Sequence, residues 1–407
     1  MILGDLADPG AVWEYAERYL GVGTRSYSPF SADLEISDAY HPQRGAARFD
    51  LPSFWVPEGQ GAYLTNRIAS GLHGLYRHGD RILLPVHPET LTFAGLAGRD
   101  ALLALAPGPP VRVAPSANAR TVFVTHVDGA AVPPHFLKLH YPRRLSRFTR
   151  RLRRPIIELQ LWVAGELARA GTRFLPEVAG GVFGTDPTES WGYVVREASP
   201  AGSGGAAAYT VPLFALYGGD YHRPDDPTLL EQLVRRAGED PAGFLCDRIV
   251  GPMIRMWLTV LFETGCALEP HGQNTLFAFA ADSPGTDLWY RDCEVYVDPV
   301  LRAAGGLDDR LPRVNIISRD IQQPRERVFS LVYDSFMGHH ALAFLARLAQ
   351  ERLGVAPGTL HDFARRTFAR HWRGACFMPP TVYYYDAVLR QGGTWRLVDT
   401  GRKPDWR

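Results

Sequence analysis

The sequence predicts a multi-domain α+β fold. Its 407 residues exceed what one hydrophobic core of ordinary size accommodates. A nearly continuous apolar segment, Ile249–Phe262, ends shortly before Gly265 and is typical of a buried helix closed by a glycine. Two strand-like runs follow, Thr275–Ala280 and Leu288–Val297, with turn residues at 282–285 between them. A core helix therefore leads into a β-hairpin, and helix and strand occur in the same part of the chain.

The N-terminal half predicts strands mixed with helices. Short runs of apolar and β-branched residues predict strands, and apolar residues at helical spacing predict helices. The predicted strands are 82–86, 111–113, 121–124 and 136–140, and the predicted helices are 11–20 and 156–170. The glycine- and alanine-rich stretch Ala201–Ala208 is the best candidate for a linker or loop.

Composition narrows the class of protein. Hydrophobic residues make up 46% of the chain and charged residues 21%, and the net charge of +1 gives no overall attraction to nucleic acid or acidic membranes. The four cysteines, Cys246, Cys266, Cys293 and Cys376, are far apart, which disfavours a structural zinc and fits a reducing compartment. Residues 1–9 contain acids and no base, so they do not predict a signal peptide, and no long apolar run predicts a membrane span. We therefore expect a cytoplasmic protein.

The polar segment Leu268–Asn274 directly follows the predicted core helix. It places an acid, an imidazole, a glycine and two amides within a few positions. In the predicted hairpin, Arg291–Glu294 lies across from the residues just after His271. Two acids, a histidine and two amides then converge on one small region. Such a cluster is either a capped helix end with a satisfied polar turn or part of a functional site.

A second polar region combines Lys138, on a predicted strand, with a dense run of arginines at 143–154. We expect this run to be partly helical, with Leu145, Phe148 and Leu152 on a buried face. The run is a solvated surface, a nucleic-acid patch or a site for small polyanions. Nucleic acid is disfavoured because 43 acids nearly balance 44 bases and few aromatic residues lie nearby. The sequence has no glycine-rich phosphate loop, so any nucleotide must be held by side chains.

These motifs resemble those of one enzyme family. Residues 269–274 match, at every position, the Glu-x-His-Gly-Gln-Asn motif of the NRPS-independent siderophore (NIS) synthetases of the aerobactin synthetase (IucA/IucC) type. Weaker matches occur in the family's order: Pro85–Pro88, Ser116–Thr121, Lys138–Leu139 with Ser146 and Arg150, and Arg291–Asp292. The resemblance runs from about residue 40 to 300, and more loosely to about 350.

The chain departs from the family pattern near both ends. The family's His-Pro-x-His-Pro-x-x-Lys motif is reduced to His41–Pro42 with arginines behind it, and little sequence precedes it. The family's basic C-terminal stretch is replaced by Tyr383–Asp386. Both departures fall where the carboxylate or the acyl acceptor would be recognised. The resemblance is therefore more informative about an ATP site than about the substrates.

The resemblance implies a hand-like architecture. Residues 1–108 would form a shortened thumb, residues 109–215 β-rich fingers, and residues 216–407 a mainly helical palm that holds the 269–294 hairpin. ATP would lie between fingers and palm, since clefts between domains are common ligand sites.

The resemblance also implies an ATP- and Mg²⁺-dependent ligase. The family adenylates a carboxylic acid, often citrate, releases pyrophosphate, and passes the acyl group to an amine, hydroxylamine or alcohol. Cations aimed at the α-phosphate stabilise such a transition state, and the candidates are Arg120, Lys138 and Arg150. Glu269 and Asp292 are candidate Mg²⁺ ligands, and His271 would hold the carboxylate or phosphate or act as a base. Further nucleotide contacts are expected from Ser116, Thr121, Gln273 and Asn274, and substrate contacts from Ser146, Arg150 and His271.

The expected partners are a small-molecule carboxylate and an amine or alcohol, with no nucleic acid and no membrane; a homodimer is left open.

Two other functions are also left open. One is a non-catalytic relative that binds a nucleotide or a metal chelate. The other is a ferric-siderophore reductase, a family with some resemblance to the C-terminal part. Those proteins hold an iron–sulfur cluster on closely spaced cysteines near the C-terminus, where this chain has only Cys376.

Overall fold

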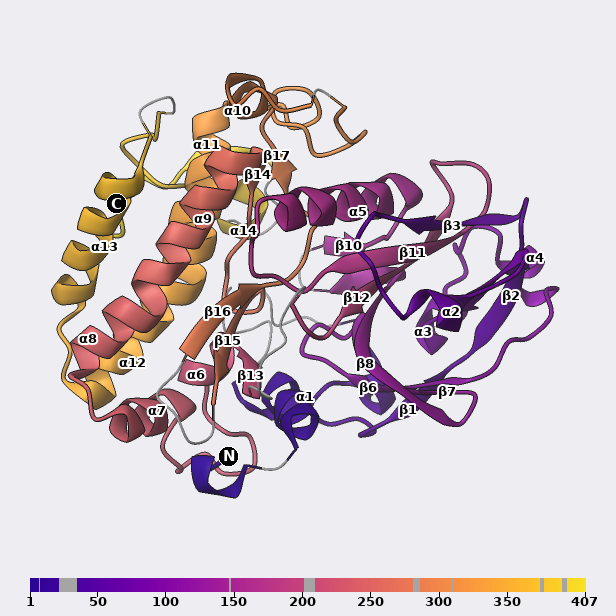
Figure 1. Ribbon diagram of the computed structural model, residues 1–407, viewed down its shortest axis with the longest axis horizontal. Coiled ribbons are helices and arrows are strands. Elements are labelled where there is room, and N and C mark those ends of the chain that lie inside the picture. The colour runs from indigo at the N-terminus through magenta and orange to yellow at the C-terminus, as the bar shows by residue number, and fades with distance from the viewer. Residues whose placement is uncertain are drawn as a thin grey trace.

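The computed structural model describes residues 1–6, 8–21, 35–145, 148–200, 209–280, 286–308, 310–373, 377–389 and 394–407. Figure 1 shows two parts side by side, one built around a large β-sheet from the N-terminal half and one built mainly from helices of the C-terminal half. The mixture of helices and strands confirms the predicted α+β class. The predicted linker at 201–208 and the predicted turn at 282–285 lie outside the described residues.

The first part is built on a seven-stranded antiparallel sheet with the strand order β1-β6-β7-β8-β12-β11-β3. Its strands are β1 (Phe49–Leu51), β3 (Gly61–Thr65), β6 (Val111–Pro115), β7 (Thr121–Val127), β8 (Ala130–Leu139), β11 (Glu177–Phe183) and β12 (Trp191–Glu197). The strands predicted at 111–113, 121–124 and 136–140 are confirmed as three neighbours in this sheet. Strands β1 and β3 precede them in the chain and are hydrogen-bonded to the same sheet.

A smaller sheet, with the order β2-β5-β4, shares a hydrophobic core with one face of the large sheet. Leu83 and Leu84 of β5 are fully buried in this core together with Val124 and Leu137 of the large sheet. The strand predicted at 82–86 is thereby confirmed. The elements on this side are β2 (Ser53–Pro57), β4 (Arg77–His78), β5 (Arg81–Pro85), α2 (His73–Tyr76), α3 (Pro88–Leu91) and α4 (Arg99–Leu103).

Helix α5 (Arg154–Arg169) covers the opposite face of the large sheet and confirms the helix predicted at 156–170. Its Ile157 packs with Val182 and Val194, which alternate along their strands with residues of the first core. The helix lies very close to the sheet at Gly180, where a Cβ atom would be 2.4 Å from the Ile157 side chain. Glycine at this position allows the close approach.

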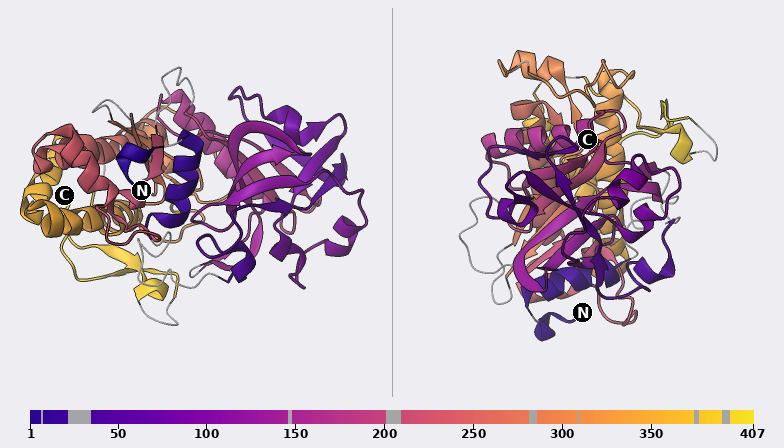
Figure 2. Two further views of the ribbon diagram at one scale, coloured as in Figure 1. Left: turned by 90° about the horizontal axis from the view of Figure 1, so that it is seen from below. Right: turned by 90° about the vertical axis from the view of Figure 1, so that its right-hand side faces the viewer.

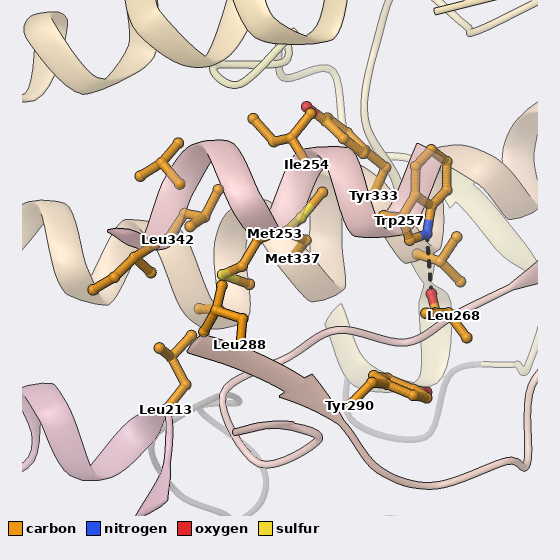
Figure 3. Packing of buried hydrophobic residues seen from close by; sticks show 14 of the residues in the cluster. Leu213, Met253, Ile254, Trp257, Leu268, Leu288, Tyr290, Tyr333, Met337 and Leu342 are labelled. Atoms are coloured by element: carbon orange, nitrogen blue, oxygen red, sulfur yellow. Dashed lines mark hydrogen bonds between the residues drawn. The ribbon is translucent and has the colours of Figure 1, made fainter. Parts of the chain in front are cut away.

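The second part is organised around α9 (Gly251–Thr264), the predicted buried helix. Figure 3 shows Met253, Ile254 and Trp257 of α9 packed among apolar side chains of neighbouring elements. Gly265 ends the helix with φ +71°, as expected of a glycine cap. The other helices are α6 (Phe214–Tyr217), α7 (Leu229–Ala237), α8 (Pro241–Leu245), α10 (Pro299–Ala304), α11 (Arg325–Ser330), α12 (Ala343–Leu353) and α13 (Pro357–His371), with π-helical segments at Cys246–Val250 and Leu331–Leu342.

The predicted hairpin lies beside this helical core. It consists of β15 (Thr275–Phe279) and β16 (Thr286–Tyr290), and β13 (Tyr209–Pro212) adds a third strand. The second predicted strand, Leu288–Val297, is partly wrong. Strand β16 ends at Tyr290 because Asp292 has φ +85°, outside the extended region. After this bend, β17 (Tyr296–Val297) pairs with β14 (Cys266–Ala267).

The arginine run does not form the predicted helix. It forms a hairpin of β9 (Tyr141–Leu145) and β10 (Phe148–Arg150). Along β9, Tyr141 and Leu145 are buried and lie on the same side of the strand, while Arg144 is exposed. The backbone of Arg144 also exchanges hydrogen bonds with Glu35, 2.9 and 3.0 Å long, which no local pattern could indicate. Ser146 lies outside the described residues.

The helix predicted at 11–20 is α1 (Pro9–Tyr19). It lies where the sheet-based and helical parts meet, and it is the indigo helix between them in Figure 2. The C-terminal stretch contributes β18 (Tyr383–Tyr385), α14 (Asp386–Leu389) and β19 (Leu397–Asp399). Among the described residues, no helix combines the length and apolar character needed to cross a membrane.

A buried ion pair joins α1 to the chain just after the hairpin. The Arg291 guanidinium donates to the Glu17 carboxylate, and both side chains are almost fully buried. Glu17 also accepts from the Ala117 N–H at 3.3 Å and from the Trp13 indole N–H at 3.2 Å. One carboxylate thus holds α1, the β6–β7 turn and the end of the β15–β16 hairpin together.

We expect Glu17→Ala to lower the free energy of unfolding by about 3 kcal/mol or more, because it leaves Arg291 charged, buried and unpaired. Glu14→Ala on the same helix is the matched control. Glu14 pairs with Arg48, whose side chain is 42% exposed, and its loss should cost less than about 1 kcal/mol. Chemical denaturation of both variants tests this prediction, and equal losses would contradict it.

Candidate functional site

The polar segment Leu268–Asn274 is a tight loop fixed from both sides. The Trp257 indole N–H of α9 donates to the Leu268 carbonyl oxygen at 3.1 Å (Figure 3). The Glu269 N–H donates to the Tyr290 hydroxyl at 3.2 Å, and the His271 carbonyl accepts from the N–H groups of Asn274 and Thr275. The core helix and the hairpin therefore set the position of this loop.

Gly272 is required in this loop by close contact. A Cβ atom at this position would lie 2.1 Å from the Tyr217 hydroxyl and 3.4 Å from the Phe214 Cβ, both on the short helix α6. Tyr217 is a rigid side chain, so a larger residue at 272 would push the loop away from α6. The glycine of the motif is therefore explained by packing.

Lys138 is the centre of the charged part of the site. It lies on β8 and is fully buried. Its ammonium donates to the Asp292 carboxylate at 2.8 Å, the Glu294 carboxylate at 3.0 Å and the Gln160 amide oxygen at 2.9 Å. All three ammonium hydrogens have acceptors, one from α5 and two from the segment after the hairpin.

Two buried arginines lie near Lys138, Arg120 in the turn directly before β7 and Arg196 on β12. Arg120 Nη2 is 3.5 Å from the Glu294 carboxylate. Arg196 bonds Glu177 through Nε at 3.0 Å, and its Nη2 is 3.9 Å from the Asp292 carboxylate. We call these six groups the charge cluster; it consists of Arg120, Lys138, Arg196, Glu177, Asp292 and Glu294. Three cations face three carboxylates, so formal charge in the cluster is balanced.

The cluster holds its two central acids ionised. Burial would raise the pKa of Asp292, but Lys138 and Arg196 outweigh burial and hold that pKa far below its ordinary value. Burial likewise opposes ionisation of Glu294, and Lys138 and Arg120 bring its pKa below the ordinary value. The backbone at Asp292, in the left-handed region, is the strained feature that turns these two acids toward the sheet.

Glu269 has the opposite behaviour. Burial, together with repulsion from Asp292 and Glu294, raises the pKa of Glu269 to about 8. Arg150 and Lys138 act against this rise without cancelling it. Glu269 is therefore mostly protonated at neutral pH and can release its proton when a cation arrives.

His271 is neutral in this site. Burial lowers its pKa to about 3, with Arg150 and Arg291 acting in the same direction. Its Nδ1 atom accepts from the Gln273 backbone N–H at 3.2 Å, which places the ring proton on Nε2. In this tautomer Nε2 carries the proton and is a hydrogen-bond donor, which suits an anionic oxygen better than it suits the role of a base.

Arg150, on β10, is electrostatically coupled to both halves of the site. Its charge acts on Arg120, Glu269, His271 and Tyr385. It is partly exposed, unlike the cations of the charge cluster. Arg150 is thus the cation best placed to meet an incoming anion.

A pair of tyrosines completes the site from the C-terminal stretch. The hydroxyls of Tyr296 and Tyr385 are hydrogen-bonded to each other. The pKa of each is raised, first by burial and then by nearby groups that include Glu269. Strand β18 thereby brings Tyr385 next to the polar segment.

The structure brings most of the predicted site residues together. Arg120, Lys138, Arg150, Glu269, His271 and Asp292 lie in one electrostatically coupled group. Ser116 closes the β6–β7 turn by donating to the Thr121 carbonyl at 2.6 Å. Asn274 donates to the Glu269 carbonyl at 3.2 Å, and the Gln273 carbonyl accepts from Arg291 at 2.9 Å. These contacts shape the loops that carry the charged residues.

Sequence reasoning missed several members of the site. Glu294 follows Asp292 by two positions, and strand-like alternation could have placed both on one side. Arg196 lies opposite Phe136 in the β8–β12 ladder, close to Lys138, but only the strand pairing reveals this. Gln160, Tyr296 and Tyr385 carry no local signal, because their partners are distant in sequence.

The described residues include no group of three or more histidine, cysteine, aspartate or glutamate side chains arranged to hold a metal ion by themselves. The described cysteines, Cys246, Cys266 and Cys293, are buried and free, and burial raises the pKa of each thiol. Cys376 lies outside the described residues. A magnesium ion at Glu269 and Asp292 would therefore need ligands from a bound nucleotide.

Comparison with known proteins gives one partial family match. The model of the ferric iron reductase FhuF-like transporter family matches residues 244–378, which are 135 of the 407 residues. This range includes α9 and the polar segment. No curated protein sequence matches the chain.

Solved structures match over almost the whole chain. ATP-bound aerobactin synthetase IucA from a hypervirulent pathotype of Klebsiella pneumoniae has a TM-score of 0.68 at 18% identity, covering 98% of this chain and 79% of that one. The petrobactin biosynthesis protein AsbB from Bacillus anthracis str. Sterne has a TM-score of 0.67 at 12% identity, covering 97% and 75%. Aerobactin synthetase IucC from the same Klebsiella pathotype has a TM-score of 0.59 at 16% identity, covering 82% and 64%. The chain thus has the fold of the NIS synthetases, as its motifs predicted.

Proposed function

We propose that this protein is an ATP-dependent ligase that adenylates a carboxylic acid and condenses it with an amine, hydroxylamine or alcohol, in siderophore or related natural-product biosynthesis. The observation that carries the proposal is the convergence of cations and acids at one place: Lys138 and Arg150 act on Glu269 of the 269–274 motif, and Arg120 and Lys138 contact Glu294 beside it. The likeness in fold to an ATP-bound aerobactin synthetase supports it. In this proposal residues 109–215 act as fingers and residues 216–407 as palm, with residues 1–108 as a shortened thumb.

The cations of the sheet would hold the triphosphate. Lys138 is bound to Asp292 and Glu294, so a phosphate that approaches it competes with these carboxylates for the ammonium hydrogens. Arg120 and Arg150 add positive charge on the same side. Positive charge fixed in advance at the α-phosphate stabilises the extra negative charge that develops as the carboxylate attacks.

Mg²⁺ fits the acidic side of the site once a nucleotide is present. Glu269 and Asp292 are close enough for their charges to repel each other, and Glu294 adds a third carboxylate. Magnesium usually takes one or two protein carboxylates and completes its shell with phosphate oxygens and water. When bound, it would neutralise phosphate charge during the displacement. Glu269 would give up its proton to serve as a ligand.

His271 and the tyrosine pair would contact the reacting acid. The Nε2–H of His271 is a donor for a carboxylate oxygen, which favours the positioning role over that of a base. Tyr296 and Tyr385 offer hydroxyls beside Glu269. The helical side of the site therefore supplies neutral donors, and the sheet side supplies cations.

The FhuF-like match favours a second candidate, a ferric-siderophore reductase. Such a protein needs closely spaced cysteines for its iron–sulfur cluster. The four cysteines of this chain are separated by at least nineteen residues, from Cys246 to Cys266, and are therefore a poor set of ligands. The ligase accounts for the charge cluster, which a reductase does not require.

The first prediction of the ligase proposal concerns products. Incubation with Mg²⁺-ATP and an accepted carboxylic acid and amine should yield AMP and pyrophosphate, because the proposed attack occurs at the α-phosphate. Chromatography of the nucleotides and a pyrophosphate assay measure this. The purified protein should be colourless. ADP and phosphate as products, or the absorption of an iron–sulfur cluster, would overturn the proposal.

The second prediction separates positioned cations from the rest of the arginine run. Arg150→Ala should lower kcat/KM by roughly 10²–10³, the scale of one lost transition-state donor, and Lys138→Ala should do at least as much. Arg143→Ala and Arg153→Ala are controls, since Arg143 contacts Thr92 near the surface and Arg153 only approaches Glu189 at 3.8 Å. Equal losses in all four variants would indicate a diffuse basic patch.

Lys138→Ala also leaves Asp292 and Glu294 without their main partner. The melting temperature of this variant must therefore be measured alongside its activity. Arg150→Ala, which removes no member of the charge cluster, keeps the test valid if Lys138→Ala does not fold. If Arg150→Ala retains native activity, the cation does not contact the phosphates.

The third prediction concerns Glu269 and pH. The unfolded carboxyl ionises near its ordinary pKa of 4.5, whereas the folded one ionises at about 8. Between pH 4.5 and about pH 8 the folded state therefore binds more protons than the unfolded state. The stability that Glu269 contributes below pH 4.5 is lost as the pH rises to about 8. Glu269→Gln should remove this decline in melting temperature.

If Glu269 also binds Mg²⁺, the rise in melting temperature produced by Mg²⁺-ATP should grow with pH through about 8 in the native protein. The same rise should be smaller and independent of pH in Glu269→Gln. A thermal-shift series from about pH 6 to pH 9 measures both effects. A variant that alters the pH dependence without ligand, yet keeps the native response to Mg²⁺-ATP, would exclude Glu269 as a metal ligand.

A further inference from the structure

A pocket lies on the face of α5 that points away from Lys138. It has a volume of about 730 Å³. Its helical wall is formed by residues 158, 161, 162, 165, 166 and 169, whose spacing of three and four places them on one side of the helix. Gln160, which contacts Lys138, falls on the other side. The remaining walls come from the end of β3 and from the loop after α10 (Figure 1).

The pocket is rich in arginine. Among the described residues, five arginines line it, namely Arg67, Arg169, Arg302, Arg310 and Arg313, against three acids, namely Glu158, Glu166 and Asp308. Each acid already has a cationic partner. Glu166 accepts from Arg302 at 2.6 Å and from Arg169 at 3.0 Å, Asp308 from Arg310 at 2.8 Å, and Glu158 from Arg154 at 2.8 Å. The positive charge of the described lining therefore exceeds what its own acids neutralise.

Two of the arginines have no acidic partner among the described residues. Arg67 and Arg313 are exposed, and they line the pocket from the sheet-based part and the helical part respectively. Arg302 is 2% exposed and donates through both terminal nitrogens, but its buried Nε–H has no acceptor among the described residues. An anion in the pocket would bring acceptors to donors that now lack them.

The unpartnered arginines stand on fixed backbone. Asn66, directly before Arg67, donates to the carbonyls of Leu161 at 3.1 Å and Glu177 at 2.7 Å. On the other wall, Arg319 donates to the Pro312 carbonyl at 2.9 Å, directly before Arg313. These anchors hold the two cations on facing parts of the molecule without occupying their guanidinium groups, so less ordering is needed when a ligand binds.

The pocket also has an apolar part. The Trp162 ring carries the Arg302 guanidinium on one face, 4.6 Å from the ring centroid, and Leu161, Leu311 and Pro312 lie beside it. Arginines in a fork geometry bind phosphate and carboxylate oxygens in pairs, and a volume of this size suits a ligand of drug or nucleotide size.

We propose that this pocket is a second binding site, separate from the ATP site, for a small molecule with several phosphate or carboxylate groups. Arg67 and Arg313 bind its charged groups from opposite walls, and Arg302 contributes the buried Nε–H. Because α5 lies between the pocket and Lys138, the two anion sites occupy opposite faces of one helix. The inference stands whether or not the chain is a ligase, since it uses none of the residues of the proposed reaction.

Isothermal titration with inorganic tripolyphosphate tests the site on the full chain. The native protein should bind two equivalents, one in each site. Arg67→Ala/Arg313→Ala should lose one of them, with at least about a tenfold weaker affinity there, because two charge-assisted contacts are removed. Arg150→Ala should lose the other equivalent and retain the pocket. The affinity for tripolyphosphate at each of the two sites should fall with added salt.

The matched control is Arg44→Ala/Arg112→Ala, which removes two exposed arginines elsewhere that already pair with acids. It should bind two equivalents like the native protein. A loss of binding in this control equal to that in Arg67→Ala/Arg313→Ala would show general charge attraction and overturn the pocket. One native equivalent that only Arg150→Ala abolishes would also overturn it. One native equivalent that only Arg67→Ala/Arg313→Ala abolishes would support the pocket and count against the ATP site instead.

Discussion

The site depends on how the charge of Lys138 is compensated inside the protein. An ammonium group in the interior is costly unless it is paired and fully hydrogen-bonded, and Lys138 achieves this with three acceptors from two separate elements. Strand β8 supplies the lysine, α5 supplies Gln160, and the bend after the hairpin supplies Asp292 and Glu294. The sheet-based and helical parts are therefore joined at the point where the proposed chemistry occurs. The residues that a bound ligand would contact are therefore the same residues that join the two parts of the protein.

A second buried contact, an ion pair from α1, fixes the same region. Glu17 of α1 holds Arg291, and Arg291 in turn fixes the Gln273 carbonyl. The residues on either side of Asp292 are thus held by different elements, Arg291 by α1 and Cys293 through a 3.3 Å bond from its N–H to Glu177 of β11. This arrangement explains how Asp292 can remain in a left-handed conformation that is uncommon outside glycine.

Burial assigns the protonation states of the site and divides it into two halves. The same desolvation that raises the pKa of Glu269 lowers the pKa of His271, because in both cases the charged form is disfavoured. The helical side therefore presents neutral groups, including the Tyr296–Tyr385 pair. The sheet side presents cations whose charge is balanced by Asp292 and Glu294. In the proposed reaction the phosphates of a nucleotide would replace these acids as partners of the cations. Helix α5 separates this site from the arginine-lined pocket, so each of its faces serves a different cationic region.

The sequence by itself determined the parts whose signals are local. The apolar run and glycine cap of α9, the β15–β16 hairpin and the strand that carries Lys138 follow from periodicity and turn residues, and the 269–274 motif indicated the fold. Only the tertiary structure decided the rest. The arginine run had apolar residues at helical spacing, yet it became the β9–β10 hairpin because bonds to Glu35 and packing of Tyr141 outweighed that weak preference. Glu294, Arg196 and Tyr385 joined the site through strand pairing and ion pairs between segments far apart in sequence. Such contacts join residues that are close in space but distant in the chain, so no short stretch of sequence shows them. The same is true of the burial that keeps Glu269 protonated and His271 neutral.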